Sequence, residues 1–140
     1  MEWTGGCLCG AVLYHSENAP VWASYCHCGM CRKVSGAPYA GFVEFQPSTF
    51  EWTKGQPVIF NSTSGVIRRF CSECGTSLTF EADGVLFLSL GSLDAPEKVE
   101  FNCHTYTEFK LPCIKLTDGL PQFPGPAGGK GGLPIHGRTE

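Results

Sequence analysis

Nine cysteines in 140 residues constrain this chain more than any other feature of its sequence. Single residues separate Cys7 from Cys9 and Cys26 from Cys28. Cysteines at this spacing are poor disulfide partners for each other, because a disulfide requires a restricted Cα separation and opposed Cβ directions. On an extended backbone their side chains instead point to the same side, where they can share a cation. We therefore expect metal or redox chemistry rather than a disulfide scaffold.

The N-terminal segment lacks the basic and apolar regions of an export signal, and no run approaches the roughly 18 apolar residues that span a membrane. We therefore predict a cytoplasmic protein without a membrane partner, in surroundings that keep thiols reduced. The net charge of −3 provides no broad basic surface for a phosphate backbone. No nucleic-acid partner is expected, and nothing indicates the oligomeric state.

The chain has the length of one ordinary domain, and 42% hydrophobic against 16% charged residues indicate a folded globular protein. Short segments rich in β-branched and aromatic residues predict strands over residues 11–15, 21–25, 39–45, 58–61, 66–70, 77–81, 85–90 and 99–102. Asp83-Gly84 predicts a hairpin turn between two of them. Residues 29–36 have room for a helix of one or two turns. We predict a mostly β, single-domain zinc-binding fold with little helix.

The C-terminal residues have a different composition. Glycine and proline make up 11 of the 22 residues from 119 to 140, and the apolar residues there follow no period. Such a segment buries too little surface to offset its ordering entropy, so we expect it to be extended or mobile. We assign residues 1–123 to the zinc-binding domain and residues 124–140 to a Gly/Pro-rich tail.

A C-x-x-C-G segment begins at Cys71 and has the spacing of a tight zinc knuckle, in which the thiolates of Cys71 and Cys74 face one ion. A closed tetrahedral site needs two more ligands, and Cys7 and Cys9, which also precede a glycine, are plausible donors. The long connection between the pairs adds little to the cost of closure, since that cost grows only logarithmically with loop length. The spacing therefore predicts a structural zinc site with four thiolate ligands.

Cys26, Cys28 and Cys31 remain as a separate triplet. Three protein ligands with an open fourth position are typical of a catalytic zinc site, where substrate or water completes the tetrahedron. Three thiolates weaken the Lewis acidity of a zinc ion but leave it able to bind another soft thiolate. Arg32 and Lys33 follow directly and would offset the negative charge. A thiol is the expected substrate.

Other residues leave alternatives open around the triplet. Strand alternation turns His27 away from the two neighbouring cysteines, whereas His104 is the better candidate to lie close to the site. The triplet could also be a second structural site closed by His104 or Cys103, or a thiol site that never loads metal. Cys103 and Cys113 are expected to be buried, inert thiols. The C-x-C-x-x-C spacing does not match the common ferredoxin patterns, so an iron–sulfur cluster ranks lower.

Arg68 and Arg69 are adjacent in a predicted strand, so we expect one to face solvent and the other to be available to a site. The segment from Ser35 to Pro38 has turn composition, and its backbone N–H groups could hold a carboxylate beside the triplet.

Five longer segments carry a resemblance to a known family. They read GGCLCGAVLY, CHCGMCRKVSGAPY, RRFCSECGTSLTF, LGSLDAPE and HTYTEFKLPCIKLTDGLPQF. In order and spacing they resemble the glutathione-dependent formaldehyde-activating (GFA) enzyme family, which also includes centromere protein V. The resemblance covers residues 4–123, and the cysteine motifs are specific when taken together. Cys113 departs from the family, whose members often carry tryptophan at this position.

The resemblance implies a twisted, all-β zinc fold of the β-tent type. It also implies a structural zinc held by Cys7, Cys9, Cys71 and Cys74. A second zinc is implied at Cys26, Cys28 and Cys31. This second zinc is associated in the family with glutathione and with formation of S-(hydroxymethyl)glutathione, a carbon–sulfur lyase reaction.

We therefore expect a zinc-dependent carbon–sulfur lyase in which the triplet is the catalytic site. Its partners would be small molecules, with glutathione as the thiol co-substrate and formaldehyde as the aldehyde. The alternative belongs to another class of protein: a non-catalytic module in which both zinc ions are structural and exposed strands bind a protein partner. The sequence leaves open the true substrate, the occupancy of the second zinc site and its fourth ligand.

Overall fold

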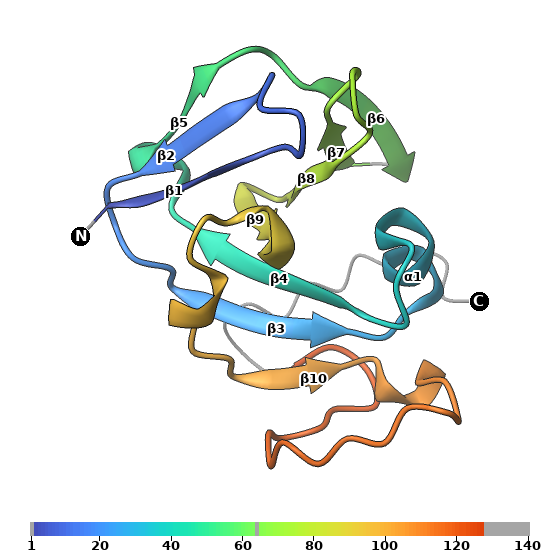
Figure 1. The fold of residues 1–140 in the computed structure, drawn as a ribbon. Coiled ribbons are helices and arrows are strands. Elements are labelled where there is room, and N and C mark those ends of the chain that lie inside the picture. Colours follow the sequence, from blue (N-terminus) through green and yellow to red (C-terminus); the bar gives the residue numbers. More distant parts are fainter. Residues whose placement is uncertain (1, 64, 128–140) are drawn as a thin grey trace.

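The computed structural model describes residues 2–63 and 65–127, and it confirms the mostly β fold (Figure 1). The smaller of the two sheets has the antiparallel order β1-β2-β5. Its strands are β1 (Trp3–Gly6), β2 (Leu13–Ser16) and β5 (Phe50–Lys54). The larger sheet has the order β10-β3-β4-β9-β8-β7-β6; the β10–β3 pair is parallel and the other pairs are antiparallel. Its strands are β3 (Trp22–Cys26), β4 (Ala40–Phe45), β6 (Val58–Thr63), β7 (Val66–Phe70), β8 (Ser77–Ala82), β9 (Val85–Ser89) and β10 (Cys103–Thr105).

Helical structure in the described residues is limited to short segments. Helix α1 (Gly29–Ser35) follows β3 directly, as predicted, and ends where Gly36 adopts a left-handed φ of 68°. It begins after Cys28, whose extended backbone and sulfur cap the first turn. The 3₁₀ helices are η1 (Pro47–Thr49), η2 (Leu90–Ser92), η3 (Pro96–Lys98) and η4 (Thr107–Phe109). No helix within the described residues is both long and apolar enough to cross a membrane.

Side-chain alternation along the central strands of the larger sheet produces two apolar cores. Val43 and Leu88 pack on the face toward the smaller sheet, whereas Phe42 and Phe87 pack on the opposite face. The first core contains Trp3, Cys7, Val12, Tyr14, Ala23, Val43, Phe45, Cys71, Leu78, Leu86, Leu88 and Leu93. The second core contains Cys26, Cys28, Cys31, Ala40, Phe42, Val66, Phe80, Ala82, Phe87 and Tyr106. The two groups of cysteines therefore belong to different cores.

Most of the predicted strands are present, and the turn at Asp83-Gly84 is confirmed. These two residues have φ values of 51° and 77°, as the central positions of a type I′ hairpin turn require. The sequence does not predict β1, β5 or β10. Two glycines weaken the strand propensity of β1, and the three residues of β10 are too few for a recognisable pattern.

The prediction of a strand over residues 99–102 is wrong, because regular pairing starts only at Cys103. Asn102, the residue before Cys103, pairs with Ala23 through the Asn102 side chain as well as the Asn102 backbone. Its Oδ1 atom accepts the Ala23 N–H at 3.0 Å, and its own N–H donates to the Ala23 carbonyl at 2.9 Å. A side-chain oxygen thus takes the place of a backbone carbonyl at this position in the ladder.

The segment that leads into the Gly/Pro-rich tail is extended and lies beside β10 (Figure 1). The His104 N–H donates to the Pro121 carbonyl, and the Phe123 N–H donates to the His104 carbonyl, both at 2.9 Å. The Tyr106 N–H donates to the Gly125 carbonyl, also at 2.9 Å. These bonds cover the outer edge of β10. Residues 128–140 of the tail lie outside the described residues, and the domain boundary at residue 123 stays a prediction.

Gly5 lies where β1 meets the side chain of Tyr14 on the neighbouring strand. An added Cβ would clash with the Tyr14 hydroxyl and with the Ser92 carbonyl oxygen. The same hydroxyl forms a buried hydrogen bond of 2.6 Å with Ser92 Oγ. We expect Gly5→Ala to lower the free energy of unfolding by about 3 kcal/mol, because it must displace these atoms.

Urea unfolding measures this loss, and Gly91→Ala is the matched control. A Cβ at Gly91 meets nothing within 4 Å, so the control should change the free energy of unfolding by less than about 0.5 kcal/mol. Equal losses in the two variants would contradict the close approach at Gly5.

Candidate metal centres

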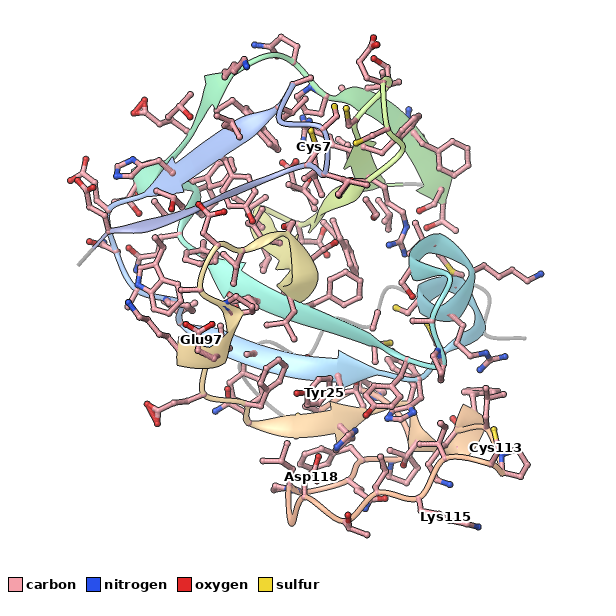
Figure 2. The ribbon with its side chains drawn as sticks, viewed as in Figure 1. Cys7, Tyr25, Glu97, Cys113, Lys115 and Asp118 are labelled. Atoms are coloured by element: carbon pink, nitrogen blue, oxygen red, sulfur yellow. The ribbon has the colours of Figure 1, made fainter. Side chains whose placement is uncertain are left out.

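The four cysteines expected to bind the first zinc come together in the structure. Cys7 and Cys9 follow β1, Cys71 and Cys74 follow β7, and their Sγ atoms all lie within 4.8 Å of one another. The Sγ atoms of Cys7 and Cys9 are 3.6 Å apart, and those of Cys9 and Cys71 are 3.8 Å apart. We call this group the four-cysteine cluster; Figure 2 labels Cys7 within it.

Hydrogen-bond donors surround the sulfurs of this cluster. The Val12 N–H donates to Cys7 Sγ at 3.3 Å. The hydroxyl and N–H of Thr76 hydrogen-bond to Cys74 and lower the pKa of its thiol to about 5. These contacts stabilise the thiolate, which is the form of cysteine that binds a metal.

The residue after each cysteine pair has the backbone conformation expected of a knuckle. Gly10 and Gly75 have φ values of 81° and 80°, which other residues rarely adopt. Each chain segment can therefore turn back at once and bring its N–H groups toward the sulfurs. Four soft, convergent sulfur ligands of this kind fit a structural zinc ion.

The triplet also converges, on the opposite side of the larger sheet. Cys26 ends β3, Cys28 precedes α1 and Cys31 lies within α1; all three are buried and their Sγ atoms lie within 4.8 Å of one another. The Sγ atoms of Cys26 and Cys28 are 3.5 Å apart. The Cys31 N–H donates to Cys28 Sγ at 3.4 Å, which fixes the helix start against the sulfur.

The electrostatics of the triplet favour a bound cation. The hydrogen bond to Cys28 and burial raise the pKa of the Cys26 thiol to about 12. Hydrogen bonds to the other two sulfurs and burial raise the pKa of Cys31 well above its ordinary value. Cys26 and Cys31 therefore resist ionisation on their own, and a dication among the three sulfurs would reverse that preference. The donor set therefore fits zinc here as well.

Among the described residues, no fourth His, Cys, Asp or Glu ligand atom lies within the same 4.8 Å as the three sulfurs. Both ring nitrogens of His104 have other partners: Nδ1 lies 2.9 Å from His27 Nε2, and Nε2 lies 2.7 Å from Asp118 Oδ2. Cys103 is buried, as expected, but does not join the group. Within the described part of the chain, neither His104 nor Cys103 closes the triplet.

The hydrogen-bonded chain from Asp118 through His104 to His27 is not predicted by the sequence. His27 is fully buried, and the ring of Tyr39 stacks on it with centroids 4.6 Å apart. The hydrogen bond to His104 lowers the pKa of Asp118 below its ordinary value. These residues lie far apart in sequence, and only the expectation that His104 lies near the site pointed toward them.

Arg32 has a structural role that the sequence does not predict. Its Nη1 atom donates to the carbonyl oxygens of His27 at 2.8 Å and Phe109 at 2.9 Å. It therefore ties α1 to the segment after β10, while the side chain of Lys33 remains exposed.

Cys113 is exposed, so the prediction of a buried thiol is wrong for this residue. It lies on the C-terminal segment beyond β10, as do Lys115 and Asp118 (Figure 2). It belongs to neither cysteine cluster of the described residues.

Burial, together with electrostatic interactions with His104, Lys110 and Arg32, lowers the pKa of His27 from its ordinary 6.5 to about 4. The folded protein therefore keeps this ring neutral at a pH where the unfolded chain takes up a proton. We expect this ring to reduce the free energy of unfolding by about 2 kcal/mol as the pH falls from 7.5 to 5.

Urea unfolding at the two pH values, for wild type and His27→Gln, measures this contribution. Glutamine keeps a polar group near the position of Nε2 but does not titrate, so the variant should lose less stability at low pH. Equal pH dependence in the two proteins would contradict the prediction.

Comparisons with known proteins agree with this geometry. The family of glutathione-dependent formaldehyde-activating enzymes matches residues 2–109. The chain is 27% identical over 126 residues to an uncharacterized lyase of Schizosaccharomyces pombe, a match that covers 87% of this chain and 90% of that protein. A crystal structure of a Rhodobacter sphaeroides protein superposes with a TM-score of 0.52 at 19% identity, over 86% of this chain and 98% of the other. This last similarity concerns the fold alone. The chain belongs to the glutathione-dependent formaldehyde-activating enzyme family.

Proposed function

We propose that this protein is a zinc-dependent carbon–sulfur lyase that forms S-(hydroxymethyl)glutathione, or the adduct of a similar small thiol and aldehyde. The observation that carries the proposal is the triplet: three buried, convergent sulfurs with no fourth protein ligand among the described residues. Membership of the family and the naming of the yeast relative as a lyase support the reaction class.

In this reaction the thiol sulfur adds to the aldehyde carbon, the carbon–oxygen π bond breaks, and the thiol proton ends on the oxygen. Zinc held by Cys26, Cys28 and Cys31 would favour the thiolate form of the substrate, which is the nucleophile. The chain's own part is to place that sulfur in an apolar, largely water-free surrounding formed by the second core.

Tyr106 is the candidate proton donor to the developing alkoxide. It packs in the second core with the triplet. Burial and the negative charge of the three cysteines raise the pKa of its hydroxyl to about 12, so it stays protonated at neutral pH. A protonated hydroxyl can donate to an oxyanion that forms within its reach.

Exchange NMR of glutathione and formaldehyde, with and without the zinc-loaded protein, tests the proposal. We expect the protein to accelerate exchange between free glutathione and the adduct. The Cys113→Ser variant, changed at an exposed thiol outside both clusters, should retain the acceleration. Equal exchange rates with and without the protein would contradict the function.

A non-catalytic binding module is the second candidate, favoured by exposed apolar side chains on the edge strand β6. Ile59 is 51% exposed and Phe60 is 57% exposed, and apolar groups of this size are often covered by a partner. Two tightly held zinc ions, no thermal shift with glutathione and no adduct formation would favour this function.

A further inference from the structure

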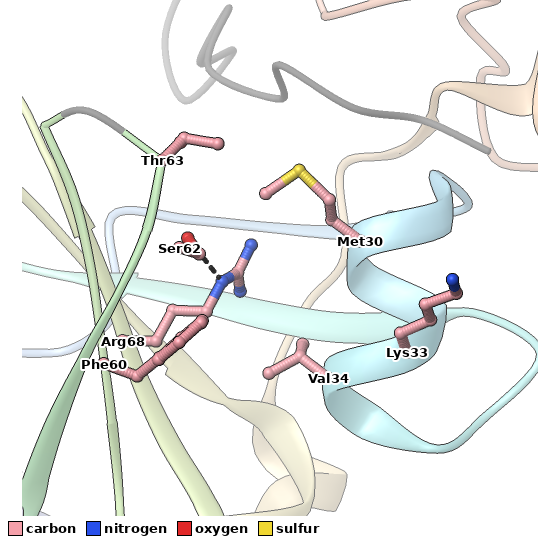
Figure 3. A pocket seen from close by; sticks show the side chains of 7 residues that line it. All are labelled: Met30, Lys33, Val34, Phe60, Ser62, Thr63 and Arg68. Carbon is pink, nitrogen blue, oxygen red and sulfur yellow. Dashed lines mark hydrogen bonds between the residues drawn. The ribbon is translucent and has the colours of Figure 1, made fainter.

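A pocket of about 350 Å³ lies between α1 and the hairpin of β6 and β7 (Figure 3). It is lined by Met30, Lys33, Val34, Phe60, Ser62, Thr63 and Arg68. Most of its surface is apolar, two of the lining side chains are cationic, and none of the seven is acidic. Such a pocket favours a ligand that is anionic at one point and aliphatic beside it.

Arg68 is held in the pocket by its neighbours in the sheet. The strand register places it opposite Phe60 on β6 and Phe80 on β8. Its guanidinium carbon lies 4.7 Å from the centroid of the Phe80 ring, and its Nε atom donates to Ser62 Oγ at 3.1 Å. One edge of the guanidinium is therefore fixed, and the group points toward α1 across the pocket (Figure 3).

The rest of the Arg68 guanidinium has no anion within the described residues. The residue is only 4% exposed, and its buried Nη2 atom has no hydrogen-bond partner. Arg69, the next residue along β7, instead pairs with Glu81. A buried cation without an anionic partner is costly, so the site is best satisfied by an anion supplied from outside.

The pocket adjoins the triplet through α1. Met30 precedes Cys31 and packs against the second core that contains the three sulfurs. Lys33 and Val34 lie about one turn further along the same helix and line the pocket. The side chain of Val34 points toward Arg68, whereas that of Lys33 extends away from it (Figure 3). Met30 therefore borders both the pocket and the core that contains the three sulfurs.

We infer that this pocket binds a carboxylate of the thiol substrate, an inference that rests on the proposed function. A carboxylate matches the planar, two-pronged donor pattern of a guanidinium, and Lys33 adds positive charge at the wall. Met30, Val34 and Phe60 contact the aliphatic part of the same molecule. The pocket thereby selects thiols that carry an acid over thiols that do not.

Isothermal titration of the zinc-loaded protein with S-methylglutathione tests the inference, because this ligand keeps the carboxylates but has no free thiol. We expect Arg68→Gln to raise the Kd by about 10- to 100-fold. Lys98→Gln removes one positive charge from η3, away from the pocket, and should leave the Kd unchanged. Equal affinity of wild type and Arg68→Gln, or no binding by wild type, would overturn the inference.

A neutral thiol without a carboxylate, 2-mercaptoethanol, provides the second arm. Its affinity should be the same for wild type and Arg68→Gln. Weaker 2-mercaptoethanol binding by the variant would show that Arg68 does not act by binding a carboxylate. The failure of the proposed function appears separately, as the absence of rate acceleration in exchange NMR. Carboxylate binding is thus tested without relying on turnover.

Thermal unfolding separates binding from a merely structural role. Arg68→Gln removes a buried charge that has no anionic partner, so its Tm should equal or exceed that of wild type. A lower Tm with an unchanged Kd would overturn the inference. If the glutamine variant does not fold, Arg68→Lys carries the test. Lysine keeps the charge but loses the two-pronged geometry, and it should still weaken S-methylglutathione binding.

Discussion

Replacing Cys71 with serine should leave the protein largely unfolded. Cys71 is 1% exposed in the first core, and with Cys74 it joins the loop after β7 to the loop after β1. A structural zinc contributes on the order of 10 kcal/mol or more, which is comparable to the whole stability of about 5–15 kcal/mol of a typical domain. Circular dichroism and zinc content per chain measure the effect, and zinc bound by the four-cysteine cluster should be lost.

Cys103→Ser is the matched control for this change. Cys103 is also 1% exposed but belongs to neither cluster in the described residues. Its replacement buries a hydroxyl in place of a thiol and should cost about 1–3 kcal/mol without loss of zinc. Similar stability of the two variants would show that the four-cysteine cluster does not hold a structural metal.

Replacing Cys28 with serine should remove the chemistry and leave the fold intact. The variant should bind one zinc ion per chain rather than two. We expect the rate of adduct formation to fall by more than about 100-fold, since loss of a hydrogen-bond partner of a metal ligand alone costs about 10- to 100-fold. Serine is a favourable residue before a helix, so α1 should keep its cap.

Metal analysis, urea unfolding and exchange NMR on the same Cys28→Ser preparation check these expectations. An unchanged rate with one zinc ion lost would rule out the triplet as the reactive site. A loss of stability as large as that of Cys71→Ser would instead make the triplet structural and favour the binding module.

The parts of the structure that depend on short-range pattern are predictable from the sequence. The spacing of Cys7 and Cys9 predicts that their sulfurs converge. The dipeptide Asp83-Gly84 predicts the hairpin turn in which it lies. Helix α1 is short, but Gly36 marks its end, because glycine readily takes the left-handed conformation found there. In each case a few neighbouring residues determine the conformation.

The parts that depend on distant contacts are not predictable in this way. Strand β10 pairs in parallel with β3, and this brings His104 to His27 across 77 positions of sequence. No local pattern identifies Asp118 as the partner of His104. Likewise, the adjacent arginines predict that their side chains diverge, but only the register with Phe60 and Phe80 shows that Arg68 is the buried one.

The placement of the two cysteine groups in separate cores has a consequence for how such proteins diverge. The larger sheet lies between them, so substitutions around one group leave the packing of the other in place. If the triplet is reactive and the four-cysteine cluster structural, as we propose, a lineage can alter or abandon the chemistry of the first while the second keeps the architecture. A family built on this plan can acquire new substrates, or lose catalysis altogether, without first having to evolve a new fold.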